Sequence, residues 1–250
     1  MTIRAVKRTS KSRPAIEGAG VKLNRVFGFG DTSEFDPFLM MDDFRNDRPE
    51  DYSAGFPWHP HRGIETITYV LAGNVDHKDS LGNSGRTGAG DVQVMSAGTG
   101  IEHAEVNAEN EETQLFQIWI IPTRNGEPPS WGAKPFPRDD RSGRFVALAS
   151  GFAEDVDALP IRTDARVLGA AVKAGETVTY KLGAGRHAYL VPASGSVTVN
   201  GVLLAQANLW GRHLARADVY LERGSDNVWR VSAKQSRTIP VQPDTRVDPE

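Results

Sequence analysis

Two short segments of the chain each carry two potential metal ligands separated by one residue. His59 and His61 form the first pair. His103 and Glu105 form the second. Alternate side chains of a β-strand leave on the same face, so each segment would point both of its donors to one side of a sheet. If the two strands face each other inside a barrel, three imidazoles and one carboxylate converge, and this donor set suits a divalent transition metal with open coordination positions.

The composition limits what else the chain can be. Its 250 residues are enough for one large β domain or two smaller ones, each with its own core. The hydrophobic content of 39% and charged content of 24% are typical of soluble globular proteins, and the net charge of -3 gives no reason to expect direct nucleic-acid binding. The chain has no cysteine, so a bound metal must use nitrogen and oxygen ligands.

The sequence has no segment that resembles a membrane span or a secretory signal. No stretch approaches the roughly 20 apolar residues that cross a bilayer. The first 13 residues contain five basic ones, but no apolar run of the required length follows them. We therefore expect a cytoplasmic protein that binds no membrane, and we expect it to be a monomer.

Short strand patterns dominate the chain. Residues 64–71, 91–95 and 115–121 are rich in β-branched and aromatic side chains and are bounded by Gly, Asn or Pro. No long stretch has a 3.6-residue apolar period, so helices should be few and short. Short strands between glycine turns predict an all-β sandwich or closed barrel. Similar patterns in the second half cover residues 144–149, 176–180, 187–191, 196–199 and 218–221.

A change in character between residues 122 and 144, where five prolines interrupt the chain, predicts a domain connection. A faint similarity between residues 68–73 and 188–195 is what two copies of one barrel would give. The second copy has no alternating histidine pair and should lack a metal site. We expect a metal-binding domain at 1–133, a second β domain without a metal site at 134–234, and a polar tail at 235–250.

Two other motifs have structural interpretations that we favour over functional ones. The spaced glycines of residues 82–90 are followed by a strand pattern, whereas a phosphate-binding loop needs a helix, so a β-turn is expected. His77 lies between Asp76 and Ser80, too close in sequence for the geometry of a catalytic triad, and a solvated loop is expected. His187 and His213 are expected to be surface or hydrogen-bonded histidines.

The paired motifs and their surroundings resemble the pirin family of bicupins. The resemblance rests on residues 59–66 and 98–105, together with residues 36–38 and 42–44, and it covers the second half of the chain only in general form. It implies an all-β bicupin fold, with two face-to-face β-barrel or jelly-roll domains and few short helices. It also implies one bound metal, most often Fe(II), with Cu, Mn, Co, Ni or Zn as alternatives, held by His59, His61, His103 and Glu105.

The residues alone leave one ligand open. Glu65 has the same strand parity as His61 and lies where most cupins place their carboxylate ligand. The resemblance favours Glu105, and Glu65 would then orient a histidine or pair with Arg62. Glu105 is also the expected catalytic base, because a carboxylate in a partly apolar pocket can have a raised pKa and accept a proton from a substrate hydroxyl.

The function that the resemblance implies is a quercetin 2,3-dioxygenase-like oxidoreductase, which opens a flavonol ring with dioxygen. Its partners would be a small aromatic substrate and dioxygen. The alternative is a regulatory protein that senses redox state through the metal and acts by protein–protein contact, as the resemblance to regulatory pirins implies. A sugar-phosphate cupin is disfavoured, because it would need a basic site without a complete metal set. Four apolar residues are candidates for the cavity or for ordinary core packing: Phe38, Met40, Phe56 and Trp58.

Overall fold

The structure is a computed structural model that describes residues 5–28, 33–107, 109, 111–200, 202–205, 213–223 and 229–240. The chain divides into two compact units. One is Lys11–Ala188, and the other joins Met1–Ser10 with Tyr189–Glu250. All four candidate metal ligands lie in the first unit. The domain boundaries expected at 133 and 234 stay predictions.

Strands form nearly all of the regular structure. Within the described ranges, the helical elements are three short 3-10 turns, η1 (Ser33–Phe35), η2 (Pro49–Asp51) and η3 (Asp139–Arg141). The expected all-β class with few short helices is therefore confirmed. Over the same residues, no helix has the length and apolar character that spanning a membrane requires.

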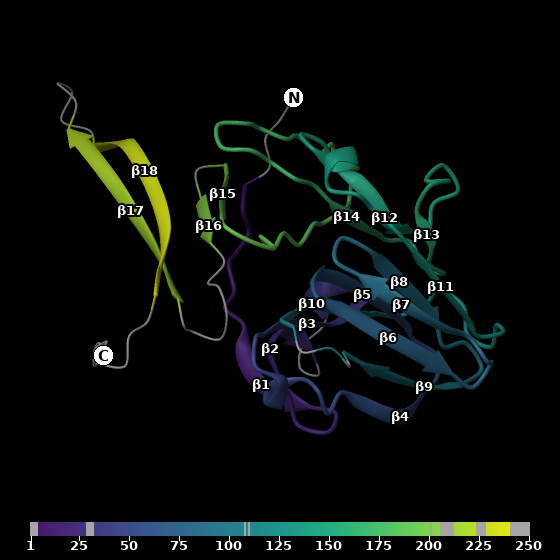
Figure 1. Ribbon diagram of the computed structural model, residues 1–250. Coiled ribbons are helices and arrows are strands. Elements are labelled where there is room, and N and C mark those ends of the chain that lie inside the picture. The colour runs from purple at the N-terminus through teal and green to yellow at the C-terminus, as the bar shows by residue number, and fades with distance from the viewer. Residues whose placement is uncertain are drawn as a thin grey trace. The chain divides into compact units, whose positions relative to one another are not determined.

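Two antiparallel sheets dominate the first unit (Figure 1). In the larger sheet the strand order is β1 (Arg13–Glu17), β2 (Val21–Gly28), β3 (Phe38–Asn46), β10 (Thr113–Ile120), β5 (Glu65–Ala72), β8 (Val92–Ser96) and β11 (Ser130–Lys134). The smaller sheet has the order β4 (Phe56–His61), β9 (Ile101–Val106), β6 (Asn74–Asp79) and β7 (Ser84–Gly88). The crossed strand orders are those of a jelly roll.

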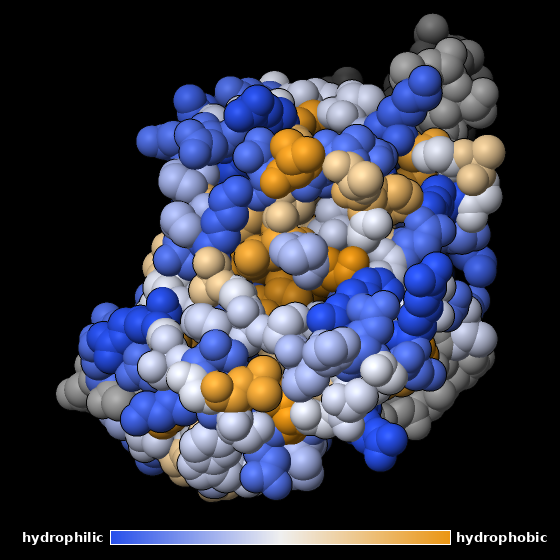
Figure 2. All heavy atoms as spheres, turned by 90° about the vertical axis from the view of Figure 1, so that its right-hand side faces the viewer, coloured by the Kyte–Doolittle hydropathy of each residue, from blue (hydrophilic) through white to orange (hydrophobic). Residues whose placement is uncertain are grey.

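The main core of the first unit joins these two sheets. Val75 comes from the small sheet and packs with residues of the large one, among them Leu23 and Val70, which have no exposed surface. A second cluster lies around Met95 and Ile101, with Trp131 packed against it. Polar residues that alternate with the core residues in the large sheet, such as Asp42, Thr68 and Gln93, are themselves buried. On the face shown in Figure 2, hydrophilic side chains cover most of the surface and hydrophobic ones gather in a few patches.

The strands of the second half lie partly at other positions than expected. β12 (Val146–Ser150) lies between β13 (Leu159–Pro160) and β14 (Arg166–Gly169), and two hairpins follow, β15 (Ser196–Val199) with β16 (Val202–Ala205) and β17 (His213–Arg223) with β18 (Trp229–Pro240). The strands expected at 176–180 and 187–191 were wrong, because these residues form no regular strand. Several of their side chains stay partly exposed, which β propensity alone does not reveal: Tyr180, Tyr189 and Leu190 are 39%, 42% and 41% exposed.

The spaced glycines at 82–90 form more than the expected β-turn. Gly82 and Gly90 have φ angles of 87° and 92° and end the segment at each side, but between them β7 pairs with β6. Glycines within β7 weaken the strand pattern, which explains the error. One of them, Gly85, permits a close packing contact described below.

Candidate metal centre

The two ligand pairs lie on neighbouring strands of the small sheet. His59 on β4 is directly opposite His103 on β9, and directly paired residues share one face of a sheet. Convergence comes from the direct pairing of β4 and β9 within one sheet and does not require the two strands to face each other inside a barrel. The ring centroids of His59 and His103 are 4.4 Å apart, and those of His61 and His103 are 5.0 Å apart. One nitrogen of each ring lies within 4.8 Å of the others, so the three imidazoles meet as predicted.

The chemistry of this donor set fits a divalent transition metal. His103 is 1% exposed, and its Nε2 is buried with no hydrogen-bond partner among the described residues. A buried polar atom is normally paired, so this nitrogen is available to a ligand. Burial, helped by the charges of neighbouring histidines, lowers the pKa of His103 to about 2 and that of His61 to about 4. Neutral imidazoles with free lone pairs are the form that binds a metal.

Glu105 lies on the same strand as His103, but its carboxylate is bound to the other sheet. Its Oε1 accepts a hydrogen bond from Gln93 Nε2 at 2.5 Å and one from Thr68 Oγ1 at 3.4 Å. Burial raises the pKa of Glu105 to about 7, although both hydrogen bonds act in the opposite direction. One carboxylate oxygen of Glu105 lies within 4.8 Å of a ring nitrogen of His77 and one of His103. These three residues form a second group of potential ligands, separate from the three-histidine group. The role of Glu105 as a metal ligand therefore stays a prediction.

Glu65 joins neither of these groups within the described part of the chain. It is 1% exposed, and its Oε2 accepts a hydrogen bond of 2.6 Å from the backbone N–H of Arg162. Ser96 donates a further hydrogen bond, and burial raises the pKa of the carboxyl group. Glu65 thus holds a segment of the second half of the chain, where we had expected it to orient a histidine or pair with Arg62.

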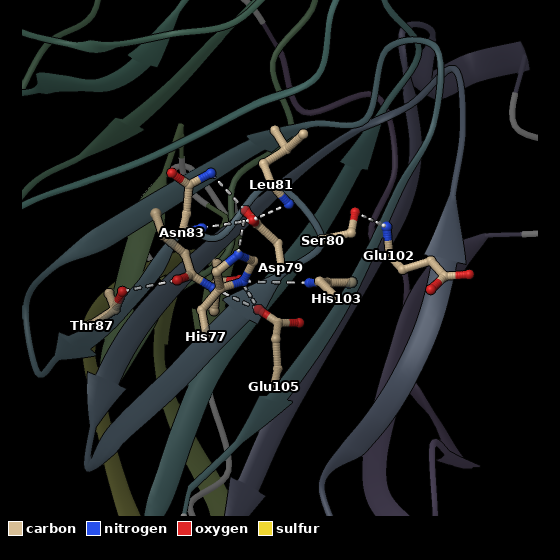
Figure 3. A network of polar contacts seen from close by, with 11 residues as sticks. His77, Asp79, Ser80, Leu81, Asn83, Thr87, Glu102, His103 and Glu105 are labelled. Atoms are coloured by element: carbon tan, nitrogen blue, oxygen red, sulfur yellow. Dashed lines mark hydrogen bonds and ion pairs between the residues drawn. The ribbon is translucent and has the colours of Figure 1, made fainter.

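His77 occupies a place that the sequence prediction missed. The expected solvated loop was wrong: His77 is 1% exposed on β6, and its ring stacks on Trp131, with centroids 4.9 Å apart and planes 8° apart. Its two nitrogens contact Asp79 and His103 (Figure 3). The available signal was the alternation of Val75, His77 and Asp79 between turn glycines, which the polar character of the segment hides. By contrast, His187 is exposed as expected, and the side chain of His213 lies outside the described residues.

The close packing of Trp131 leads to a prediction about Gly85, which pairs with His77 across β6 and β7. A Cβ atom on Gly85 would lie 2.5 Å from the Trp131 ring. We expect Gly85→Ala to displace the indole and to lower the free energy of unfolding by about 1–3 kcal/mol, as overpacking does. Gly88→Ala on the same strand is the control, because its Cβ would meet nothing closer than 3.7 Å. Urea unfolding measures both, and equal effects would contradict the packing argument.

A cavity of about 410 Å³ lies beside the histidines, and Glu105 is part of its wall. The rings of Trp119 and His61 are nearly perpendicular, with centroids 5.1 Å apart. Three of the four apolar residues suggested by the sequence contribute to the lining, namely Met40, Phe56 and Trp58. Phe38 is not among the lining residues described here. Apolar walls and histidines at one side suit a small planar ligand.

The same cavity contains one charged cluster. Arg25 donates two hydrogen bonds to Asp42, each 2.9 Å long, and a third to Glu17. All three residues line the cavity. A paired guanidinium and carboxylate in this wall offer both donors and acceptors to hydroxyl groups of a ligand.

The chain is similar to known proteins in both sequence and structure. Residues 20–120 match the family model described as Pirin, and residues 147–209 match that described as Quercetinase C-terminal cupin domain. A pirin-like protein of Caulobacter vibrioides is 67% identical over 152 residues, which cover 61% of this chain and 66% of the relative, slightly less than two thirds of its length. The quercetin 2,3-dioxygenase of Escherichia coli K12 is 37% identical over 158 residues, covering 63% of this chain and 67% of that protein.

A solved structure extends the similarity to three dimensions. The crystal structure of the bacterial pirin YhhW from Escherichia coli, in complex with nickel(II), superposes with a TM-score of 0.65 at 32% sequence identity. The superposition covers 78% of this chain and 82% of that one.

Proposed function

This chain belongs to the pirin family, and from that premise we propose that it is a metal-dependent dioxygenase that opens the ring of a flavonol such as quercetin. Family membership also confirms the bicupin class expected from the sequence. The observation that carries the proposal is the meeting of three imidazoles, two of which, those of His59 and His61, line a largely apolar cavity. The proposed partners are a small aromatic substrate and dioxygen, and the proposed location is the cytoplasm.

We propose that one divalent transition metal is held by His59, His61, His103 and Glu105, with Fe(II) as the metal used in the cell. The unpartnered Nε2 of His103 supports a metal at this point, and the nickel(II) complex of the related bacterial pirin supports a divalent ion. A bound metal would supply Lewis acidity, which favours ionisation of a substrate hydroxyl.

The proposed role of Glu105 is to accept the proton of that hydroxyl. Gln93 and Thr68 both donate to its Oε1. Among the described residues no hydrogen bond to Oε2 is present, so we assign the proton-accepting role to Oε2. Its raised pKa, about 7, suits proton transfer near neutral pH. The remaining residues of the cavity orient the substrate and exclude water.

The cavity residues also support a planar, hydroxylated substrate. A volume of about 410 Å³ is within the usual range for small-molecule sites. Trp119 and Phe56 would lie against an aromatic ring system, and the Arg25–Asp42 pair would bond a hydroxyl group at a charged part of the wall. Binding by apolar contact with a few polar anchors fits a flavonol better than it fits a sugar phosphate.

The test is oxygen-dependent loss of flavonol absorbance by protein reconstituted separately with iron, manganese, cobalt, nickel and copper. We expect turnover in at least one metal form, with one dioxygen consumed and one carbon monoxide released per flavonol opened. His103→Ala, which removes the imidazole with the unpartnered nitrogen, should abolish that turnover. Protein that binds metal but turns over no flavonol in any form would instead favour the regulatory role by protein–protein contact.

A further inference from the structure

A continuous line of buried polar groups connects the turn between β6 and β7 with the candidate metal centre. His77 Nε2 lies 3.2 Å from Asp79 Oδ2, and His77 Nδ1 lies 3.4 Å from His103 Nδ1. Figure 3 shows the His77 ring between the other two side chains. The exposed fractions of Asp79, His77 and His103 are 5%, 1% and 1%. The second nitrogen of His103, Nε2, is the buried atom without a described partner.

The surroundings of Asp79 define the direction of these hydrogen bonds. Its Oδ1 accepts the backbone N–H groups of Leu81 at 2.9 Å and of Asn83 at 3.0 Å. Its Oδ2 accepts the side-chain amide of Asn83 at 2.9 Å. These three hydrogen bonds stabilise the ionised carboxylate, which carries no proton and can therefore only accept from His77. The proton between Asp79 and His77 therefore belongs to His77 Nε2.

The proton on His77 Nε2 determines the roles of His77 Nδ1 and His103 Nδ1 in the hydrogen bond between them. A neutral imidazole with a proton on Nε2 has a lone pair on Nδ1, so His77 Nδ1 accepts. His103 Nδ1 must then donate, and its proton leaves His103 Nε2 with a free lone pair. We infer that Asp79 and His77 are positioning residues that fix the tautomer of His103 and so prepare its Nε2 for a metal. The link to the metal rests on the ligand set proposed above, but the tautomer assignment does not.

Packing restrains the same ring. Trp131 stacks on His77, which limits rotation of the imidazole away from His103. The opposite tautomer of His103 would carry its proton on Nε2, the buried nitrogen without a described partner that we assign to the metal. Outer partners of this kind typically change metal affinity by about 10–100-fold. Neither His77 nor Asp79 is among the described residues that line the cavity, so we expect their effect to reach the chemistry through His103.

Nitrogen NMR of the metal-free full-length protein tests the tautomers directly. With ¹⁵N-labelled histidine, we expect His77 to carry its proton on Nε2 and His103 to carry its proton on Nδ1. A His77→Gln protein identifies the His77 signals by their loss. A proton on Nε2 of His103 in the wild-type protein would overturn the inference, whatever the protein does with metal.

The Asp79→Asn variant reverses the donor without changing the size of the side chain. The backbone N–H groups of Leu81 and Asn83 keep the amide oxygen on their side, so the new NH₂ group points at His77 and donates to its Nε2. His77 Nδ1 then donates to His103, whose Nε2 becomes protonated. We expect the affinity for Ni(II), measured by chelator competition, to fall by about 10–100-fold.

The matched control is Asp76→Asn, on the same strand but in an ion pair with Arg86. We expect it to bind Ni(II) within twofold of the wild-type protein. Equal affinities for folded Asp79→Asn and Asp76→Asn would overturn the inference. If Asp79→Asn does not fold, His77→Phe retains the stacking on Trp131, removes both nitrogens and should show the same loss. Wild-type protein that binds no Ni(II) would contradict the proposed metal centre, while the NMR experiment still decides the tautomer.

Discussion

A His103→Ala protein should lose more than about 100-fold in affinity for divalent metal. This exceeds the loss of about 10–100-fold that is typical when a residue that contacts a ligand, but not the metal, is removed. His103 belongs to both groups of potential ligands in the described structure, so neither group survives its removal. Metal at 100 times the dissociation constant stabilises a protein by about 2.7 kcal/mol, and this stabilisation should disappear from thermal unfolding curves. His187→Ala removes an exposed histidine and should leave the shift intact.

His61→Ala then distinguishes the two groups of ligands. His61 belongs to the three-histidine group, whereas Glu105 belongs to the group with His77. If the metal binds where the three imidazoles meet, His61→Ala should abolish the metal-dependent shift in unfolding temperature. A full shift in His61→Ala, with none in His103→Ala, would place the metal between His77, His103 and Glu105.

Glu105→Gln should have opposite effects on metal-free stability and on activity. The folded-state pKa of Glu105 is about 7, above the ordinary value of 4.5, so the folded protein holds the extra proton between these values. The stability that this group contributes is thus present below pH 4.5 and is lost as the pH rises through 7. The Glu105→Gln variant cannot ionise and so avoids that loss. A pKa that rises from 4.5 to about 7 on folding corresponds to about 3 kcal/mol in the free energy of unfolding.

The comparison is made by urea unfolding of metal-free proteins at pH 4 and pH 8. We expect Glu105→Gln to match the wild-type protein at pH 4 and to be more stable by up to about 3 kcal/mol at pH 8. The titration of the neighbouring histidines occurs in both proteins and largely cancels. The metal-loaded variant should lose turnover, because its base and one proposed ligand are gone. Glu102→Gln, an exposed change on β9, is the control, and the same gain there would refute the role of burial.

The sequence was sufficient to predict the all-β class and the meeting of the three histidines, because both depend on local alternation. His59 and His61 share one strand face whatever the fold, and so do His103 and Glu105. The relation between the two strands is not local. Whether β4 and β9 pair within one sheet or face each other depends on the order of all strands in the small sheet, which no single segment specifies.

His77 shows a second limit of sequence patterns. Strand prediction relies on apolar residues at alternate positions, and here two of the three inward residues, His77 and Asp79, are polar. Their burial depends on partners that are distant in sequence, such as Trp131 and His103. The tyrosines of the second half show the converse, since Tyr180 and Tyr189 lie in segments with a suitable pattern but form no strand and stay partly exposed. Tertiary contacts decide both cases.

Strands of both sheets line the cavity, and the two sheets have different roles in the proposed function. The candidate ligands all lie on β4 and β9 of the small sheet, whereas β3 and β10 of the large sheet supply much of the remaining wall. Substitutions along those two strands can therefore alter which ring system fits while leaving every ligand in place. Descendants of one ancestral scaffold can exchange substrates through drift in half of a single cavity, so shared metal chemistry within the lineage need not imply a shared metabolite.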